Sequence, residues 1–168
     1  MKHVPNLLSA ARLLAAPYIF WLLWTKQFDT ALVWFALAGI TDALDGYLAR
    51  KLHVESPTGA YLDPIADKVL LSGAFLILAM NGAIPTWLTV LVLGREGAIL
   101  FVAGIFLLKK TRKSFPPTLA GKLSTAVQIV FILAVVAASA PPVLQWSVAL
   151  VTAWSGLDYA RLALLQRD

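Results

Sequence analysis

The chain has 168 residues, a formal net charge of +5 and no cysteine, so it has the length of one domain and cannot form disulfides. Hydrophobic residues make up 60% and charged residues 14% of it, compared with roughly 45–50% and 25% in ordinary soluble domains. This composition excludes a disordered chain and a typical soluble domain, and it predicts a single membrane-embedded domain over residues 1–168.

Six apolar stretches each have a length of about 20 residues, which is enough for a helix to cross a bilayer. Turn residues separate them, for example Asn81-Gly82, Pro116-Pro117 and Pro141-Pro142. Continuous apolar runs without two-residue alternation favour helices over the strands of a barrel. We therefore expect an all-α integral membrane protein with six transmembrane helices, at residues 6–25, 29–50, 59–81, 85–108, 118–139 and 142–164.

The basic residues predict an orientation in the membrane. They are concentrated near both termini and in the connections after the second and fourth predicted helices. Basic residues in short loops stay on the cytoplasmic side, so we expect a multi-pass protein of the bacterial inner membrane with both termini and these two connections in the cytoplasm. The positive charge then fixes the orientation of the helices in the membrane and attracts anionic lipid headgroups. Because it is scattered over short loops, we expect no nucleic-acid partner.

Four aspartates lie inside the second and third predicted helices, where a charged side chain costs about 2.5–3.5 kcal/mol or more. Asp42 and Asp45 are three residues apart, and Asp63 and Asp67 are four apart, so each pair lies on one face of its helix. We expect the two helices to be antiparallel neighbours joined by a short cytoplasmic connection, so that all four carboxylates share a cavity open to the cytoplasm. Their mutual repulsion requires either protonation or bound cations. One or two ions of Mg²⁺, Mn²⁺ or Ca²⁺ suit an all-oxygen set of ligands.

The stretch from Asp42 to Asp67 reads DALDGYLARKLHVESPTGAYLDPIAD and contains D-x2-D-G-x2-A-R-x8-G-x3-D-x3-D in full. This pattern resembles the signature of the CDP-alcohol phosphotransferases (CDP-alcohol phosphatidyltransferases). A looser resemblance covers nearly the whole chain, through PNLLSAAR, GRE at 94–96 and GKLSTAVQ at 121–128. The resemblance implies a six-helix membrane enzyme, usually a homodimer, that transfers the phosphatidyl group of a CDP-linked lipid such as CDP-diacylglycerol to an alcohol and releases CMP.

The same resemblance implies roles for individual residues. The four aspartates would hold one or two divalent cations, Mg²⁺ or Mn²⁺, and Asp67 would also be the general base for the acceptor hydroxyl. The small residues near the aspartates leave room for a ligand against the backbone, although helix packing is the alternative reading. Contacts to the CDP-linked lipid are implied for Asn6, Gly46, Ala49, Arg50, Ser56 and Gly59.

Three basic residues in apolar helices are candidates to bind an anionic acceptor: Arg12, Arg95 and Lys122. Snorkelling to the interface is the alternative for each. Glu96 is expected to be a partner of Arg95 or a supporting group, and Lys68 to form a structural ion pair or to lie at the interface.

Two acceptors fit the pattern. Members of the family that use glycerol 3-phosphate, the phosphatidylglycerophosphate synthases, resemble the chain at PNLLSAAR and GRE. They usually carry a further arginine eight residues after the GRE arginine, where this chain has Ala103. The stretches FALAGITDALDGYLAR, LDPIADK and PPTLAGKLSTAVQ look closer to the cardiolipin synthases, so phosphatidylglycerol is the expected acceptor and glycerol 3-phosphate the alternative.

A cation or proton transporter is the alternative of another class, because transporters also use intramembrane carboxylates. That reading does not explain the glycine, alanine and arginine at fixed offsets between the aspartates. The sequence also lacks the inverted repeats that many transporters have. The pattern therefore favours an enzyme.

Overall fold

The computed structural model describes residues 4–52, 59–108, 118–137 and 140–165, and within these the side chains of 12–41, 68–101, 118–137 and 140–162. The described residues form six α-helices, as the apolar stretches predict. Each boundary lies within three residues of the expected one. The helices are α1 (Val4–Trp24), α2 (Phe28–Leu52), α3 (Gly59–Met80), α4 (Thr86–Leu108), α5 (Leu119–Val136) and α6 (Pro142–Leu165).

Local sequence signals end and begin these helices. α1 and α3 both close with the paired backbone hydrogen bonds of a Schellman motif: the N–H groups of Gln27 and Ala83 donate to the carbonyls of Leu22 and Leu78, both at 2.9 Å. The motif needs a left-handed residue, and Gly82 supplies it after α3 with a φ of 72°. α5 begins at an N-cap, because the Thr118 hydroxyl accepts a hydrogen bond from the Gly121 N–H at 3.0 Å.

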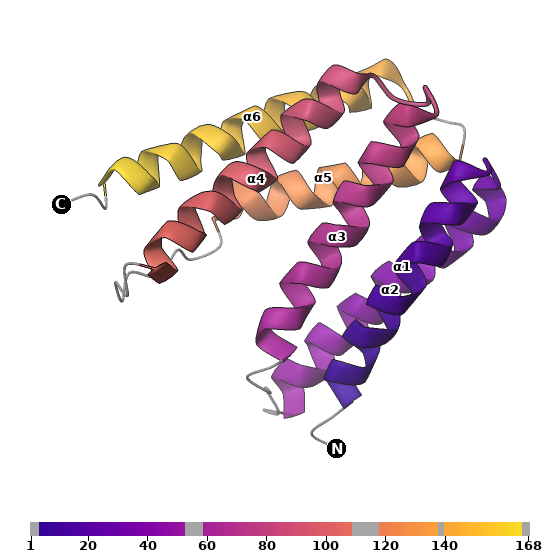
Figure 1. Ribbon diagram of the computed structural model, residues 1–168, viewed down its shortest axis with the longest axis horizontal. Coiled ribbons are helices and arrows are strands. Elements are labelled where there is room, and N and C mark those ends of the chain that lie inside the picture. The colour runs from indigo at the N-terminus through magenta and orange to yellow at the C-terminus, as the bar shows by residue number, and fades with distance from the viewer. Residues whose placement is uncertain (1–3, 53–58, 109–117, 138–139, 166–168) are drawn as a thin grey trace.

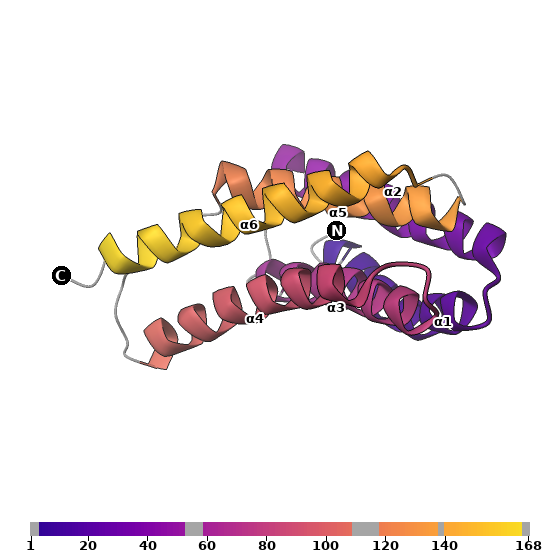
Figure 2. The ribbon, with the colours of Figure 1, turned by 90° about the horizontal axis from the view of Figure 1, so that it is seen from above.

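The helices pack in two layers, which Figure 2 shows from above. One layer contains α1, α3 and α4, with α3 packed against both neighbours, and the other contains α2, α5 and α6, with α5 packed against both. Contacts of α1 with α2, of α3 with α5 and of α4 with α6 join the layers. α2 and α3 therefore stand in different layers, and no direct packing between them is found in the described parts of the chain. The expectation that they are immediate neighbours is not met there.

The two ends of the molecule differ. The connections between α1 and α2, between α3 and α4, and between α5 and α6 gather at one end (Figure 1). At the other end the helices spread apart, with the start of α1, the end of α2 and the start of α3 on one side and the end of α6 on another. We call the region where α2 ends and α3 begins the signature end, because the aspartate-bearing parts of both helices lead to it.

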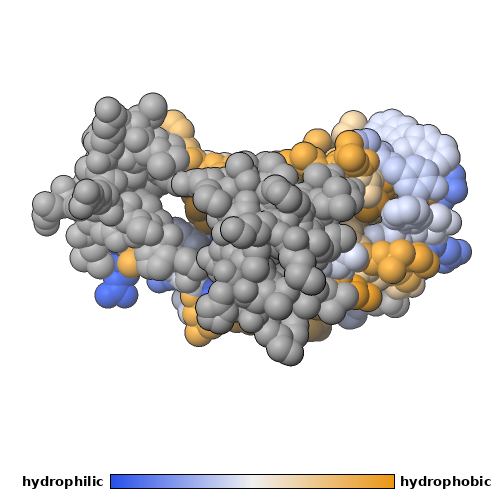
Figure 3. All heavy atoms as spheres, turned by 90° about the horizontal axis from the view of Figure 1, so that it is seen from below, coloured by the Kyte–Doolittle hydropathy of each residue, from blue (hydrophilic) through white to orange (hydrophobic). Residues whose placement is uncertain are grey.

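The interior is apolar and so is much of the outside. The side chains of Ile19, Phe75 and Ile132 are fully buried or nearly so, and Phe75 stacks on Phe131 across the layers with ring centroids 6.0 Å apart. All six tryptophans are exposed. Figure 3 shows apolar side chains over much of the coloured surface, with paler and more polar ones at the end where α1 meets α2. Monomeric soluble proteins rarely expose so much contiguous apolar surface.

Within the described residues, one apolar helix, Leu119–Val136, is long and apolar enough on its own to cross a membrane. Shorter apolar helical segments occupy 12–24, 28–41 and 68–80.

Candidate functional site

The aspartate signature lies on helices, as its spacing predicts. Asp42 and Asp45 belong to α2, and Asp63 and Asp67 belong to α3. Their side chains lie outside the described ones, so their convergence on a cation remains a prediction. Among the described residues, no group of three or more His, Cys, Asp or Glu side chains could hold a metal ion.

The residues expected to contact the CDP-linked lipid fall mostly on the same helices. Asn6 lies in the first turns of α1, Gly46, Ala49 and Arg50 lie in the last part of α2, and Gly59 is the first residue of α3. Their side chains, like all of Ser56, are outside what the structure describes, and their roles remain predictions.

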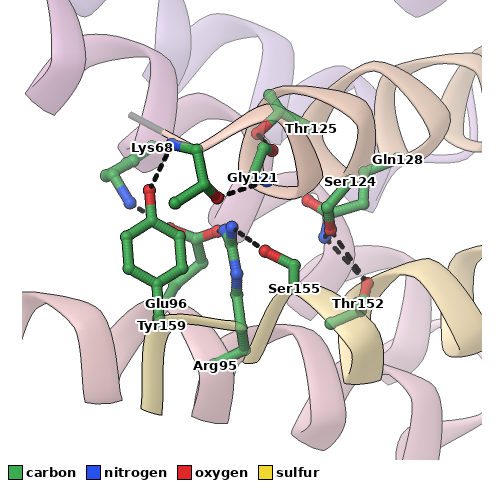
Figure 4. A network of polar contacts seen from close by, with 11 residues as sticks. Lys68, Arg95, Glu96, Gly121, Ser124, Thr125, Gln128, Thr152, Ser155 and Tyr159 are labelled. Carbon is green, nitrogen blue, oxygen red and sulfur yellow. Dashed lines mark hydrogen bonds and ion pairs between the residues drawn. The ribbon is translucent and has the colours of Figure 1, made fainter. Parts of the chain in front are cut away.

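An ion cluster next to the signature, buried except at Lys68, joins α3 to α4. The Glu96 carboxylate pairs with the Lys68 ammonium through one oxygen and with the Arg95 guanidinium through the other. Figure 4 shows these side chains pointing toward one another. The pairing confirms that Glu96 is a partner of Arg95 and that Lys68 forms an ion pair. Among the described side chains two cations share one carboxylate, so these three groups together carry a net positive charge.

Helices α5 and α6 fix the Arg95 guanidinium from the other layer. Its Nη2 donates to the Ser155 hydroxyl at 2.6 Å, and its central carbon lies 5.5 Å from the centroid of the Tyr159 ring, within the range of a cation–π contact. The Tyr159 hydroxyl also accepts a hydrogen bond from the Thr118 N–H at 3.4 Å. A Cβ on Gly121 would stand 3.1 Å from that hydroxyl and 3.2 Å from Nη2. Glycine at this position therefore permits the close approach of the two side chains to α5.

A second polar group lies between α5 and α6. The Gln128 side chain is fully buried, and its amide nitrogen donates to the hydroxyls of Ser124 and Thr152, each at 3.1 Å. The two hydroxyls also bond one another at 3.3 Å. The Gln128 Oε1 has no hydrogen-bond partner among the described residues, although it is buried. Interhelical hydrogen bonds of this kind are worth about 0.6 kcal/mol each on average in membrane proteins.

Two cavities adjoin these groups. A small one of about 50 Å³ is bordered by polar side chains that include Lys68, Glu96 and Gln128. A larger one of about 450 Å³ lies between the layers, among α1, α2, α3 and α5, and the described side chains that line it are apolar apart from Arg12 and Thr125. Leu71 and Thr125 line both cavities, so the two adjoin at these side chains.

The three basic residues expected to bind an acceptor have different surroundings. Arg95 belongs to the ion cluster through its pair with Glu96, whereas Arg12 is buried on α1 and lines the larger cavity. Lys122 is exposed on α5, next to Gly121. The structure thus places Arg12 at the larger cavity and leaves Lys122 at the surface. Arg95 is paired with Glu96, which borders the small cavity.

Sequence reasoning missed the partners contributed by α5 and α6. Ser124 and Gln128 are four residues apart, as are Ser155 and Tyr159, and such a spacing places each pair on one helical face. A search for polar pairs at this spacing in apolar helices would have found both pairs. It would not have shown that one faces Arg95, which is sixty positions from Ser155 in the chain.

Comparison with known proteins places the chain among its relatives. The sequence model of the CDP-alcohol phosphatidyltransferase family matches residues 2–155, which is most of the chain. The chain belongs to this family of membrane proteins. Family membership confirms the resemblance that the aspartate signature carries.

Relatives of two kinds match. A cardiolipin synthase (CMP-forming) of Rattus norvegicus is 36% identical over 153 residues, covering 80% of this chain and 50% of the rat protein. A probable phosphatidylglycerophosphate synthase of Mycobacterium tuberculosis is 37% identical over 176 residues, covering 98% of this chain and 83% of that protein. A CDP-diacylglycerol–glycerol-3-phosphate 3-phosphatidyltransferase of Bacillus subtilis is 32% identical, covering 84% and 80%. The chain spans about half the length of the cardiolipin synthases from rat and human.

Proposed function

We propose that this protein is a membrane enzyme that transfers the phosphatidyl group of CDP-diacylglycerol to a glycerol-type alcohol and releases CMP. The observation that carries the proposal is the complete eight-position signature on α2 and α3 in a chain of the CDP-alcohol phosphatidyltransferase family. The relatives bear names of such transferases. Family membership does not favour a cation or proton transporter.

The chemistry follows from the signature residues. The acceptor oxygen attacks the phosphorus that bears the diacylglycerol, the bond from that phosphorus to CMP breaks, and the acceptor proton passes to the Asp67 carboxylate as general base. Asp42, Asp45, Asp63 and Asp67 form an all-oxygen donor set on two helices, which fits Mg²⁺ or Mn²⁺, one or two ions. When bound, such ions neutralise charge on the pyrophosphate and on the leaving CMP.

Binding of the donor is assigned to the signature end. Arg50 can form two hydrogen bonds to phosphate oxygens there. The small residues beside it on α2 and at the start of α3 would let the nucleotide approach the backbone. Asn6 and Ser56 complete the proposed set with Gly46, Ala49 and Gly59.

The acceptor is phosphatidylglycerol in our proposal, as in the cardiolipin synthases. The net positive ion cluster of Lys68, Arg95 and Glu96 supports an anionic acceptor in general. Glycerol 3-phosphate is the second candidate, because the relatives named for that acceptor are matched over more of their own length. Arg12 and Lys122 are proposed as further contacts to the acceptor.

The exposed apolar side chains support six membrane crossings. Three exposed tryptophans lie close to helix ends that face the connections, Trp24 at the end of α1, Trp87 at the start of α4 and Trp146 near the start of α6, as expected of an interfacial aromatic belt. We assign the end where three connections gather (Figure 1) to the non-cytoplasmic side, so the signature end and both termini face the cytoplasm. A homodimer is proposed from the family resemblance.

An acceptor panel tests the proposal. The purified protein in detergent is given radiolabelled CDP-diacylglycerol with phosphatidylglycerol, with glycerol 3-phosphate or with water alone, each with Mg²⁺ and with EDTA. We expect CMP and cardiolipin to form only with Mg²⁺ and phosphatidylglycerol. A product formed with glycerol 3-phosphate alone would reverse the order of the acceptors, and no CMP release with either acceptor would refute the transferase.

A further inference from the structure

The larger cavity has the volume and the lining of a site for a hydrocarbon chain. Its volume of about 450 Å³ lies within the roughly 300–1,000 Å³ of small-molecule sites. Its apolar lining includes Phe35, Leu70, Ile129 and Leu133, from both layers. Along α5 the lining extends from Thr125 to Leu133, a rise of about 12 Å at 1.5 Å per residue.

The charged side chain of the cavity, Arg12, lies toward one end. Arg12 is about two turns from the start of α1, whereas the lining residues of α2 and α3 nearest the signature end, Ile40 and Leu70, are about three turns from it. A positive charge therefore stands closer to the signature than the apolar part of the cavity does. An amphiphile with an anionic head near the signature would place its chain in the apolar part.

The position of the cavity favours the acceptor over the donor as the source of that chain. The cavity adjoins the small polar cavity at Leu71 and Thr125, and the ion cluster of Lys68 and Glu96 borders the small cavity. Most of the proposed donor contacts lie beyond Thr41, on the last part of α2 and the start of α3, and Asn6 lies at the very start of α1. One lipid molecule could therefore place its head group at the ion cluster and its chain in the larger cavity.

We infer that the cavity between α1, α2, α3 and α5 binds one acyl chain of a lipid acceptor, with the anionic head of that lipid at Arg12 and the Lys68–Glu96–Arg95 cluster. The inference rests on the proposed function and deepens it. Glycerol 3-phosphate has no acyl chain and would occupy only the polar region at Arg12 and the ion cluster. If the apolar region of the cavity is needed for transfer, the acceptor is therefore phosphatidylglycerol.

Gly39 offers a way to fill the cavity without disturbing the helices. It lines the cavity, and among the described residues no atom lies within 4 Å of a Cβ built on it. Gly39→Leu would therefore place a side chain in the cavity. Gly97 on α4 is equally open but lies outside the lining of both cavities, so Gly97→Leu is the matched control.

The test uses photo-crosslinking in nanodiscs of phosphatidylcholine. Diazirine-acyl phosphatidylglycerol, diazirine-acyl CDP-diacylglycerol and diazirine-acyl phosphatidylcholine are compared, and the labelled peptides are mapped by mass spectrometry. We expect the phosphatidylglycerol probe to label residues 35–40 and 129–133, unlabelled phosphatidylglycerol to compete, and Gly39→Leu but not Gly97→Leu to reduce the labelling. Labelling by the CDP-diacylglycerol probe instead, or equally by all three probes, would overturn the inference.

Kinetics give a second readout. Gly39→Leu should lower kcat/KM for phosphatidylglycerol about tenfold, the effect of excluding roughly two methylenes from an apolar site. The KM for CDP-diacylglycerol should not change, and a rise in that constant alone would assign the chain to the donor. Crosslinking needs no turnover, so a wild-type protein that transfers to no acceptor would refute the proposed function separately from the cavity.

Discussion

Removing the charge of Glu96 tests the ion cluster directly. In Glu96→Gln, the Lys68 ammonium and the Arg95 guanidinium lose their shared carboxylate. The Lys68 side chain is 33% exposed and the Arg95 side chain 6% exposed. An exposed ion pair contributes about 0–1 kcal/mol, whereas breaking a buried one costs about 3–5 kcal/mol. Most of the loss should therefore come from Arg95, whose remaining partners among the described side chains are Ser155 and Tyr159.

The measurement is the free energy of unfolding by SDS in mixed micelles, for three variants. Glu96→Gln should lower it by about 3–5 kcal/mol. Lys68→Met should lower it by less than about 1 kcal/mol. The double variant Arg95→Met/Glu96→Met should be less destabilised than Glu96→Gln. It removes the buried guanidinium together with its carboxylate, so no unpaired charge is left in the buried part of the cluster. A loss in Lys68→Met as large as that in Glu96→Gln would refute the assignment of the stability to the buried pair.

Three further predictions concern the signature and Gly121. Asp67→Asn should keep CDP-diacylglycerol binding and lower the transfer rate by about 10²–10⁴-fold, the usual contribution of a general base; near-normal turnover would remove Asp67 from that role. EDTA should abolish CMP release and added Mg²⁺ or Mn²⁺ should restore it, and release that persists in EDTA contradicts a metal-dependent reaction. Gly121→Ala should lower the free energy of unfolding by about 1–3 kcal/mol, because the added Cβ displaces Arg95 or Tyr159. Gly156→Ala should not lower it, because a Cβ there would lie 3.8 Å from the nearest Arg95 atom. Equal losses in the two variants would contradict the close packing at Gly121.

The sequence predicted the six helices and their ends well because strong local signals mark them. Apolar runs of bilayer length end at Asn81-Gly82 and begin after Pro141, and both signals act within a few residues. The pairing of helices was not predictable in this way. Helices that are apolar on most faces carry no single stripe that points to a partner, so the separation of α2 from α3 into two layers had no sequence signal.

The candidate site was predictable to a similar degree. The spacing of the aspartates placed them on α2 and α3, and Glu96 next to Arg95 suggested the ion pair that the structure contains. Contacts between segments that are distant in the chain could not be predicted from the sequence. The bond from Arg95 to Ser155 depends on how α4 and α6 cross between the layers, which no local pattern specifies.

The division of the aspartates between two layers has a mechanical consequence. Asp42 and Asp45 belong to a helix of one layer, and Asp63 and Asp67 to a helix of the other. An ion coordinated by both pairs of aspartates would hold the two layers of helices together. Occupancy by Mg²⁺ should then slow the separation of these halves and raise the heat tolerance of the whole protein, even with no lipid substrate present.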